Sequence, residues 1–524
     1  MADRIDAVTI VGGGIAGWLS AVMLDRFLNT GSDAPVRITV IESPSPDAPM
    51  AGEATLPSLP NLLRQLGISE SEVFRRCHAT FKLGVRYTGW DTDHRGKPLR
   101  YLVAHTAEPL CAGRPAALYH LAFGGGGPDF AQAALPASAL IGMSRGPRTP
   151  ADGEYGARAG YGYHLDPEAF AHLLWETAVQ RGIEHVLADV AEVERDDAGN
   201  AAALRLADGG AVPVQLVFDT TGRIHRELGG AEVEAAPTPN DRVIAARMPA
   251  PRGAKKRPSM DVTALSAGWA WDFPLRNRIG AGYVFSAQHL SDEQARDELL
   301  ALLGRGASEA GVQVRTLPAR FGWLRRRWVG NCIALGPAAA AHEPLEATAV
   351  AGINRAVRWL MYYWPDRGDP GALRERYNGL MRQLDQEIAD YTATHYRLSN
   401  RADTAYWQAV SGRVPVSAAH RANLDLWQTS LPGKDDVTRN ALFQAGTYTM
   451  MLFGKGFYRG RALPKSRDLA ERDWAEHRRK VEAAKAQMGR NLPDHDALLA
   501  ATRGDRGQQV AGLTTLAGEQ PAMP

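Results

Sequence analysis

Two charged residues stand in apolar surroundings, far apart in a chain of 524 residues. Lys82 lies in the segment Ala79-Thr80-Phe81-Lys82-Leu83-Gly84, and Glu346 follows Pro344 and Leu345. Apolar neighbours lower the pKa of a lysine by desolvation, and a carboxylate in a dry site can take a proton from a substrate. Each residue also has an ordinary interpretation. A lysine can extend its amine to water from an apolar segment, and a carboxylate can complement the positive end of a helix.

A glycine-rich turn near the N-terminus predicts a dinucleotide site. Gly12-Gly13-Gly14-Ile15-Ala16-Gly17 matches G-x-G-x-x-G between an apolar strand (6–11) and a segment with helical spacing (15–27). The first glycine allows the tight turn, the second the approach of a pyrophosphate and the third the packing of helix on strand, with the phosphate at the helix N-terminus. Glu42 ends the next strand, in position for a ribose hydroxyl. The alternative is a tight turn with no ligand. We predict that the cofactor is bound by Gly12, Gly14, Ile15, Ala16, Gly17 and Glu42.

NAD and FAD share this fingerprint, so a later segment must distinguish them. The segment 331–339 predicts a strand that runs into a small-residue turn at Gly336. Such a turn lets a second backbone segment approach an extended cofactor, and it is similar to the two-part FAD site of the aromatic hydroxylase fold. Only one complete glycine fingerprint is present, which argues against a separate NAD(P)H domain. The predicted class is α/β with α+β elements, an FAD-binding Rossmann-like fold of the aromatic hydroxylase type with a large C-terminal helical substrate region.

The composition of the chain suggests three units. Residues 1–350 are predicted to form an FAD-binding and mixed-sheet module, and residues 351–503 a helical module that covers the substrate. The segment near 100–160 is rich in Gly, Ala and Pro and predicts a substrate loop, since long loops in compact enzymes are usually functional. Residues 504–524 are polar and glycine-rich and are predicted to be disordered.

Charge and cysteine content exclude several classes of function. Lys and Arg number 60 and Asp and Glu number 58, so the net charge of +2 predicts no nucleic-acid partner. Cys77, Cys111 and Cys332 lie far apart and form no CxxC, which argues against a disulfide framework or a metal site and predicts a cytoplasmic protein. Neither a signal segment nor an apolar run long enough to span a bilayer is evident. The sequence leaves open whether the protein forms a homodimer.

Several separated motifs, in the same order, resemble those of the flavin-dependent tryptophan halogenases. The similarity includes Trp18 after the glycine box and a segment similar to the G-E-A/S-T-x-P loop that lies over the flavin, which adds Gly52, Glu53, Ala54 and Thr55 to the predicted cofactor residues. Thr80-Phe81-Lys82-Leu83-Gly84 is similar to the family's catalytic-lysine segment. Trp269-Ala270-Trp271-Asp272-Phe273-Pro274 is similar to its W-x-W-x-I-P signature. Pro344-Leu345-Glu346-Ala347-Thr348 is similar to its P-L-E-S-T segment, which carries the catalytic glutamate.

The resemblance implies a mechanism and a set of partners. Reduced FAD, supplied by a separate flavin reductase, and oxygen would oxidise a bound chloride or bromide to hypohalous acid, which then halogenates an electron-rich ring. Lys82 would hold this oxidant by a hydrogen bond or carry it as a haloamine, and both routes stay open. Glu346 would stabilise the cationic ring and take its proton. The N–H groups of Thr348 and Ala349 would hold the halide at the start of a helix.

The predicted substrate is less well determined. Trp269 and Trp271 would separate flavin from substrate, although their alternation on a strand also fits core packing. His120 and Phe123 resemble the family's ring-stacking H-x-F pair, one residue longer, and a loop-anchoring role for His120 is the alternative. The segment 446–456 has one tyrosine, Tyr448, and no acid, where members acting on free tryptophan typically carry consecutive tyrosines and an acidic residue.

We therefore predict an indole derivative or a tryptophan within a peptide as substrate. Ala347, Ala349 and Phe273 also replace the usual serine, glycine and isoleucine, which leaves the preference between chloride and bromide open. A flavin-dependent aromatic hydroxylase is the alternative activity, and a flavoprotein without catalysis is the third hypothesis.

Overall fold

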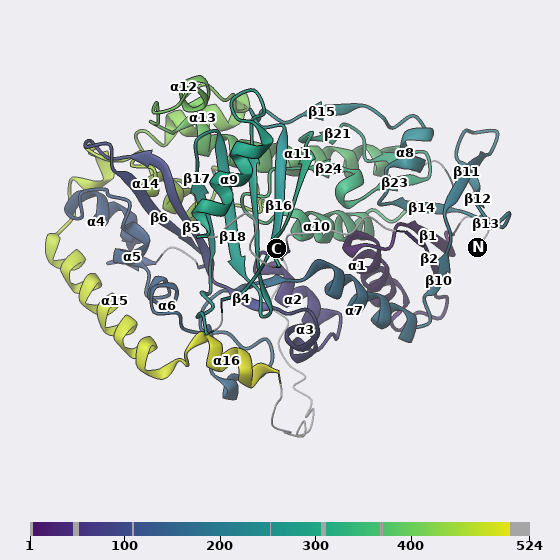
Figure 1. Ribbon diagram of the computed structural model, residues 1–524, viewed down its shortest axis with the longest axis horizontal. Coiled ribbons are helices and arrows are strands. Elements are labelled where there is room, and N and C mark those ends of the chain that lie inside the picture. The colour runs from purple at the N-terminus through teal and green to yellow at the C-terminus, as the bar shows by residue number, and fades with distance from the viewer. Residues whose placement is uncertain are drawn as a thin grey trace.

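A parallel sheet forms one end of the molecule in the computed structural model (Figure 1), which describes residues 4–45, 52–106, 109–251, 253–304, 311–366, 368 and 370–503. Every residue of its central strand β1 is buried, as expected of a parallel sheet covered on both faces. Five strands are parallel and β22 is antiparallel. The order is β10 (Glu184–Leu187), β2 (Arg37–Glu42), β1 (Ala7–Val11), β14 (Leu216–Asp219), β23 (Cys332–Ala334) and β22 (Trp328–Val329).

A seven-stranded mixed sheet occupies the middle of the molecule (Figure 1). Its strands pair antiparallel except for β17 with β5. Residues two apart on a strand face the same side, so β18 presents Trp269 and Trp271 together. The order is β20 (Gln313–Pro318), β16 (Arg242–Pro249), β19 (Arg278–Phe285), β18 (Gly268–Pro274), β17 (Met260–Ala264), β5 (Gly84–Thr92) and β6 (Pro98–Ala104).

Four small sheets complete the β structure of the described residues. The sheet formed by β3 (Glu53–Ala54), β9 (Gly162–Leu165) and β4 (Thr80–Lys82) matters most for function, because it joins two of the sequence motifs. The others are β11 (Val190–Arg195) with β12 (Ala201–Leu206) and β13 (Ala211–Pro213), β15 (Val233–Ala235) with β21 (Gly322–Leu324) and β24 (Ala340–Ala341), and β7 (Leu110–Cys111) with β8 (Arg114–Pro115).

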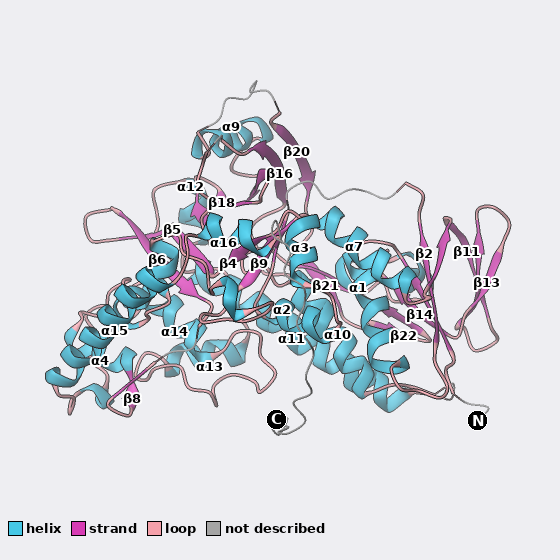
Figure 2. Cartoon of the chain, turned by 90° about the horizontal axis from the view of Figure 1, so that it is seen from below, coloured by secondary structure: helices cyan, strands magenta, loops and turns pink. Residues whose placement is uncertain are grey.

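Helices surround both large sheets (Figures 1 and 2). Near the parallel sheet, α1 packs against α7 and α10. Helix α1 (Ile15–Leu24) continues as a π turn at Asp25–Asn29. The other helices up to α10, apart from those in the segment 100–160, are α2 (Ser58–Gln65), α3 (Glu70–Arg76), α7 (Pro167–Gln180), α8 (Arg223–Glu227), α9 (Asp292–Leu302) and α10 (Ala349–Tyr362). The C-terminal helices are α11 (Gly371–Arg397), α12 (Ala405–Val410), α13 (Ala418–Leu426), α14 (Ala445–Gly454), α15 (Glu471–Asn491) and α16 (His495–Thr502).

The predicted α/β class is confirmed, and the region after residue 350 is helical as expected. The segment near 100–160 differs from the predicted loop, because it forms α4 (Ala116–Phe123), α5 (Phe130–Ala134) and α6 (Ser138–Gly142). Helices this short give too few turns to show a helical period in the sequence. The glycine turn that follows Phe123, with positive φ at Gly125 and Gly126, matches the prediction, and so does the stretch 143–161, which is irregular apart from a 3-10 turn at Pro150–Asp152.

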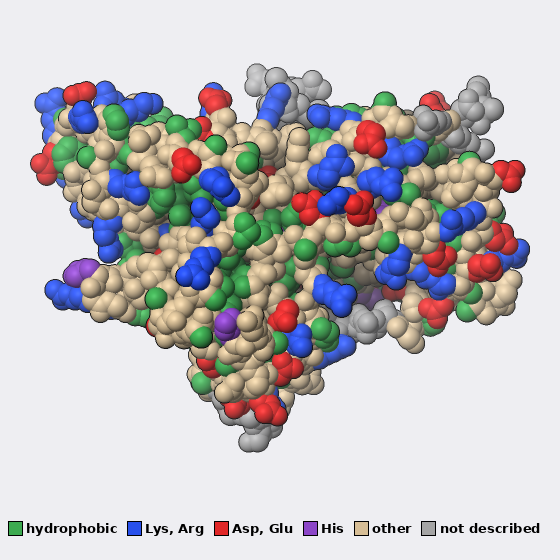
Figure 3. Space-filling model, turned by 90° about the horizontal axis from the view of Figure 1, so that it is seen from above, with side chains coloured by type: hydrophobic (Ala, Val, Ile, Leu, Met, Phe, Trp, Pro, Cys, Tyr) green, Lys and Arg blue, Asp and Glu red, His purple; other side chains and the backbone are tan. Residues whose placement is uncertain are grey.

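One continuous apolar core contains residues from the parallel sheet, the mixed sheet and the C-terminal helices. The predicted boundary at residue 350 therefore stays a prediction, and the predicted tail 504–524 lies outside the described residues. Cys77, Cys111 and Cys332 are free and buried. In the described part of the chain, no helix combines the length and apolarity needed to cross a membrane. Figure 3 shows basic and acidic side chains mixed over one face, in keeping with the small net charge.

Candidate active site

The glycine fingerprint leaves space at one position and none at its two ends. A β-carbon added at Gly12, whose φ is +109°, would lie 2.1 Å from Thr220 Oγ1, and one added at Gly17 would lie 1.9 Å from the Gly12 carbonyl oxygen. A β-carbon at Gly14 would meet no atom within 4 Å in the described structure. Gly14 is the N-cap of α1 and has no side-chain hydrogen bond there, so the first N–H groups of the helix are available to an anion.

Two further segments reach this turn. Glu42 ends β2 with its carboxylate against Gly13, and its Oε2 lies 3.1 Å from His185 Nε2, a neighbour that the sequence analysis missed. Gly336 has a φ of +58°, and a β-carbon there would lie 2.5 Å from the β-carbon of Ala16. The predicted second cofactor segment therefore packs against the first. The open position at Gly14, the uncapped helix and this close backbone approach fit an extended dinucleotide such as FAD.

The small sheet brings Lys82 to the segment 52–55. Ala54 and Thr80 both pair with His164, one from each side of β9, and Lys82 lies opposite Gly162. The Lys82 amine donates a hydrogen bond of 3.3 Å to the Thr55 carbonyl oxygen. A β-carbon at Gly162 would lie 2.4 Å from that oxygen, so glycine is required there for the approach.

Lys82 is completely buried and titrates near neutral pH. Burial lowers the pKa of its amine to about 8, although the charges of Glu346 and Glu53 act in the opposite direction. Burial raises the pKa of Glu53 to about 7, opposed by Lys82. Lys82 therefore populates both its ammonium and its neutral amine form at pH values near 8.

Glu346 shares this buried region with Lys82. Its Oε1 accepts hydrogen bonds from the hydroxyls of Tyr87 and Tyr391, the latter at 3.2 Å. Burial raises the pKa of Glu346, while the charge of Lys82 and the two hydroxyls lower it. The structure thus brings together the two residues that the sequence singled out. The two tyrosines were missed, because neither lies in a recognisable motif.

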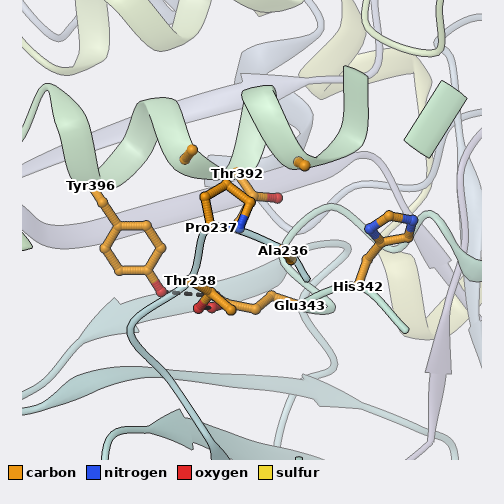
Figure 4. A pocket seen from close by; sticks show the side chains of 9 residues that line it. Ala236, Pro237, Thr238, His342, Glu343, Thr392 and Tyr396 are labelled. Carbon is orange, nitrogen blue, oxygen red and sulfur yellow. Dashed lines mark hydrogen bonds between the residues drawn. The ribbon is translucent and has the colours of Figure 1, made fainter. Parts of the chain in front are cut away.

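A second buried glutamate, Glu343, fixes the tryptophan strand. Its Oε2 accepts from Trp269 Nε1 at 2.8 Å and from the Tyr396 hydroxyl at 2.7 Å, and its Oε1 accepts from Asn240 Nδ2 at 3.0 Å. Figure 4 shows Tyr396 and Thr238 directed towards this carboxylate, which lines a cavity of about 20 Å³. Trp271 packs beside Trp269 with ring centroids 5.5 Å apart. Trp269 therefore has a fixed orientation on a strand close to the Glu346 segment.

The residues predicted to hold halide directly follow Glu346. Ala347 has a φ of +58°, which turns the chain into α10. Thr348 is the N-cap of this helix and is buried, whereas Ala349 is exposed. The cap has no side-chain hydrogen bond, so the first N–H groups of α10 remain available to an anion.

In the described structure, His120 makes no hydrogen bond or ring contact with Lys82 or Glu346. His120 is 1% exposed, bonds the Gly127 carbonyl oxygen at 3.2 Å through Nε2 and packs on Phe130, Phe453 and Trp474. These contacts anchor the loop, and the predicted stacking of His120 on a substrate ring stays a prediction. Phe123 is partly exposed at the end of α4.

His105 instead lies near the catalytic candidates. Its amide donates to the Leu83 carbonyl oxygen at 2.8 Å, and burial together with the charge of Lys82 lowers the pKa of its imidazole well below the usual value. The sequence analysis missed this histidine, since no motif marks it. Tyr448 lies one ring away from the site, with its centroid 5.3 Å from that of Tyr391.

Comparison with known proteins identifies the family of this chain. The tryptophan halogenase family model matches residues 7–471. The chain is 30% identical over 533 residues to the 7-chloro-L-tryptophan 6-halogenase KtzR of Kutzneria sp. (strain 744), covering 95% of this chain and 99% of that protein. A tryptophan halogenase structure from Shewanella frigidimarina matches with a TM-score of 0.88 at 27% identity, over 96% of this chain and 98% of that one. BrvH, a flavin-dependent halogenase from Brevundimonas sp. BAL3, matches with a TM-score of 0.84 at 29% identity, over 95% and 99%. The chain therefore belongs to the tryptophan halogenase family.

Proposed function

We propose that this flavin-dependent halogenase attaches chloride or bromide to the ring of an indole derivative or of a tryptophan within a peptide. Lys82 holds the oxidised halogen and Glu346 takes the ring proton. The observation that carries the proposal is the meeting of Lys82, Glu346 and the segment 52–55 in one buried region. The names of the relatives favour halogenation over hydroxylation.

When bound, FAD in its reduced form, delivered by a separate reductase, would give electrons to oxygen, and the oxygen reduced in this way would take further electrons from the halide and so oxidise it. The residues that would hold it are those of the fingerprint, Glu42, the segment 52–55 and Gly336. The N–H groups at Thr348 and Ala349 would hold the halide at the start of α10, the helix that follows Glu346.

Lys82 connects this side of the site to the substrate side. Its hydrogen bond to the Thr55 carbonyl oxygen holds the amine at the segment 52–55, and its charge acts on Glu346. As an ammonium, Lys82 donates a hydrogen bond to hypohalous acid and withdraws electrons from it. As a neutral amine, it takes up the halogen and releases water. A pKa of about 8 makes both forms available, so the pH dependence of the rate distinguishes them.

Glu346 acts after the halogen has bonded to the ring. A carboxylate in a low-dielectric site stabilises the cationic ring strongly. It then accepts the proton from the halogenated carbon, and the electron pair of that C–H bond returns to the ring. The buried setting excludes water, which would otherwise compete for the oxidant.

The substrate proposal depends on α14. Tyr448 packs among Tyr391, His420 and Trp427, and Lys455 at the end of the helix is paired with Asp91. The stretch 446–456 contributes no acidic side chain to bind a free ammonium group. An indole without the charged amino-acid group fits this apolar helix better than free tryptophan does.

The test supplies the full chain with FAD, NADH, a flavin reductase, oxygen and chloride or bromide. Substrates are indoles, free tryptophan and tryptophan peptides, products are identified by mass spectrometry, and catalase removes peroxide from uncoupled turnover. We expect halogenated indole or peptide, no product from Lys82→Ala and strongly reduced product from Glu346→Gln.

Two results would overturn the proposal. One is hydroxylated product from the wild-type enzyme with no halogenated species. The other is halogenation by Lys82→Ala at the wild-type rate, since the oxidant would then not depend on this amine.

A further inference from the structure

The carboxylate of Glu346 is held on one side only. The hydroxyls of Tyr87 on β5 and Tyr391 on α11 both donate to Oε1. Among the residues that the structure describes, none donates a hydrogen bond to Oε2. Glu346 itself is 4% exposed, so both oxygens lie in a region nearly closed to water. Its two oxygens therefore differ in what they can do: Oε1 is engaged and Oε2 is available.

Aromatic stacking fixes both phenols in place. Tyr87 stacks on both Tyr101 and His395, with ring centroids 4.8 Å away in each case and interplanar angles of 7° and 20°. Tyr391 stacks on Phe443 at 3.8 Å and 13°. Rings packed in this way do not turn their hydroxyls towards another acceptor without disturbing the core. The two hydrogen bonds are thus features of the packed core.

Both phenols remain donors over the working pH range. Burial, followed by the charge of Glu346, raises the pKa of Tyr87 and of Tyr391 well above the ordinary value. A hydrogen bond to the ionised form of an acid favours ionisation and lowers its pKa. The two tyrosines therefore oppose the effect of burial on Glu346.

Other groups near Glu346 affect it without a hydrogen bond to its carboxylate in the described structure. Lys82 on β4 contributes its charge, without a hydrogen bond to Glu346 in the described structure. Tyr101 on β6 stacks on Tyr87, but its hydroxyl bonds His395 Nδ1 at 3.0 Å. Tyr101 thus has the same side chain and the same neighbourhood without a contact to the carboxylate.

We propose that Tyr87 and Tyr391 are positioning residues that hold Oε1 of Glu346 and keep the carboxylate ionised, so that Oε2 takes the ring proton. The C–H bond at the halogenated carbon breaks, its electron pair restores the aromatic ring, and the proton forms an O–H bond with Oε2. The assignment of Oε2 as base rests on the proposed function of Glu346.

The experiment measures the protonation of Glu346 directly. Infrared difference spectra of the full chain are recorded against pH, with and without FAD, and the carboxylic-acid band of Glu346 is identified by its loss in Glu346→Gln. We expect Tyr87→Phe and Tyr391→Phe each to raise the titration midpoint by about one pH unit, and the double variant to raise it further. The matched control Tyr101→Phe leaves the midpoint unchanged. Melting temperatures confirm that each variant is folded.

Turnover by the same variants provides the second measurement. The acid limb of kcat moves to higher pH in Tyr87→Phe and Tyr391→Phe, while KM for the aromatic substrate stays close to wild type. Unchanged midpoints in both variants, or an equal shift in Tyr101→Phe, would overturn the inference. If the Glu346 titration midpoints shift as expected but the enzyme halogenates none of the substrates, the proposed function is wrong. The inference that Tyr87 and Tyr391 bind Oε1 and favour the ionised carboxylate is then still supported.

Discussion

The two buried lysines Lys82 and Lys455 show how differently this fold treats a buried amine. Lys455 caps the end of α14 and forms an ion pair of 2.6 Å with Asp91, both side chains being no more than 1% exposed. Its amine also lies 6.0 Å from the ring centroid of Trp90. Lys82 bonds a backbone carbonyl oxygen at 3.3 Å, and its two carboxylate neighbours act on it without a direct contact.

This difference separates a structural lysine from a reactive one. A contact ion pair commits the amine to one partner. Burial still disfavours both charges, so it lowers the pKa of Lys455 and raises the pKa of Asp91 to about 6. Lys82 donates one hydrogen bond to a backbone carbonyl oxygen, so its other N–H groups can bind another molecule, and nearby carboxylates prevent its pKa from falling further. A buried lysine with carboxylates near but not in contact is therefore the better candidate for chemistry.

The largest expected effect is on turnover by Lys82→Met. Methionine fills similar volume without an amine, so we expect the rate of halogenation to fall by at least about 10³-fold, as when a principal stabilising group is removed. The melting temperature at pH 7 should stay unchanged or rise, since a poorly solvated amine is lost. Product formation with reductase and halide provides the measurement. A rate within tenfold of wild type would contradict the distinction between the lysines.

Lys455→Met should have the opposite profile. It leaves Asp91 buried without its partner, so we expect a loss of about 3 kcal/mol in the free energy of unfolding. Halogenation per folded molecule should stay near wild type. The double variant Asp91→Leu with Lys455→Met serves as control, and most of the lost stability should return because neither charge remains. Denaturant unfolding gives the free energy of unfolding of the wild type, of Lys455→Met and of the double variant. If Lys455→Met is as stable as the wild type, the ion pair is not structural.

The sequence predicted the parts of the site that are built from local backbone. The fingerprint at 12–17 acts through contacts within a few residues, such as Gly17 against the Gly12 carbonyl oxygen, and a pattern can encode such contacts. Lys82 and Glu346 were found because each lies in a distinctive segment. The predicted cofactor roles of Gly14 and Glu42 fit the geometry, and they stay predictions until a ligand is bound.

The parts that could not be predicted depend on long-range packing. Tyr87 reaches Glu346 across 259 positions of sequence, and only the register of β5 and the docking of α11 place the two tyrosines at one oxygen. His120 was predicted from its similarity to a local motif, whereas no motif marks His105. The short helix α4 turns His120 into packing against α14 and α15, whereas pairing between β5 and β6 carries His105 to Lys82.

The pH dependence of turnover tests the chemical form of Lys82. With a pKa of about 8, Lys82 changes charge within an accessible pH range. If the neutral amine carries the halogen, the rate rises about tenfold per pH unit below 8 and levels off above it. If the ammonium donates a hydrogen bond, the rate is flat below 8 and falls above it. The folded-state pKa lies below the unfolded value, so stability should also rise with pH between about 8 and 10.5.

The smallest expected effect tests whether carboxylates out of contact hold the pKa of Lys82 in this range. Glu53→Gln removes one of them, so the pKa of Lys82 and the midpoint of the rate profile should move down by about half a pH unit. Because burial raises the pKa of Glu53 to about 7, its charge acts on Lys82 mainly above that pH, and the shift should be full there. FAD is kept saturating, since Glu53 is also a predicted cofactor residue, and Glu192→Gln on the exposed side of β11 is the matched control. An unmoved midpoint would mean that burial alone sets the pKa of Lys82, and the contrast with Lys455 would then depend on the missing ion pair and not on the distant carboxylates.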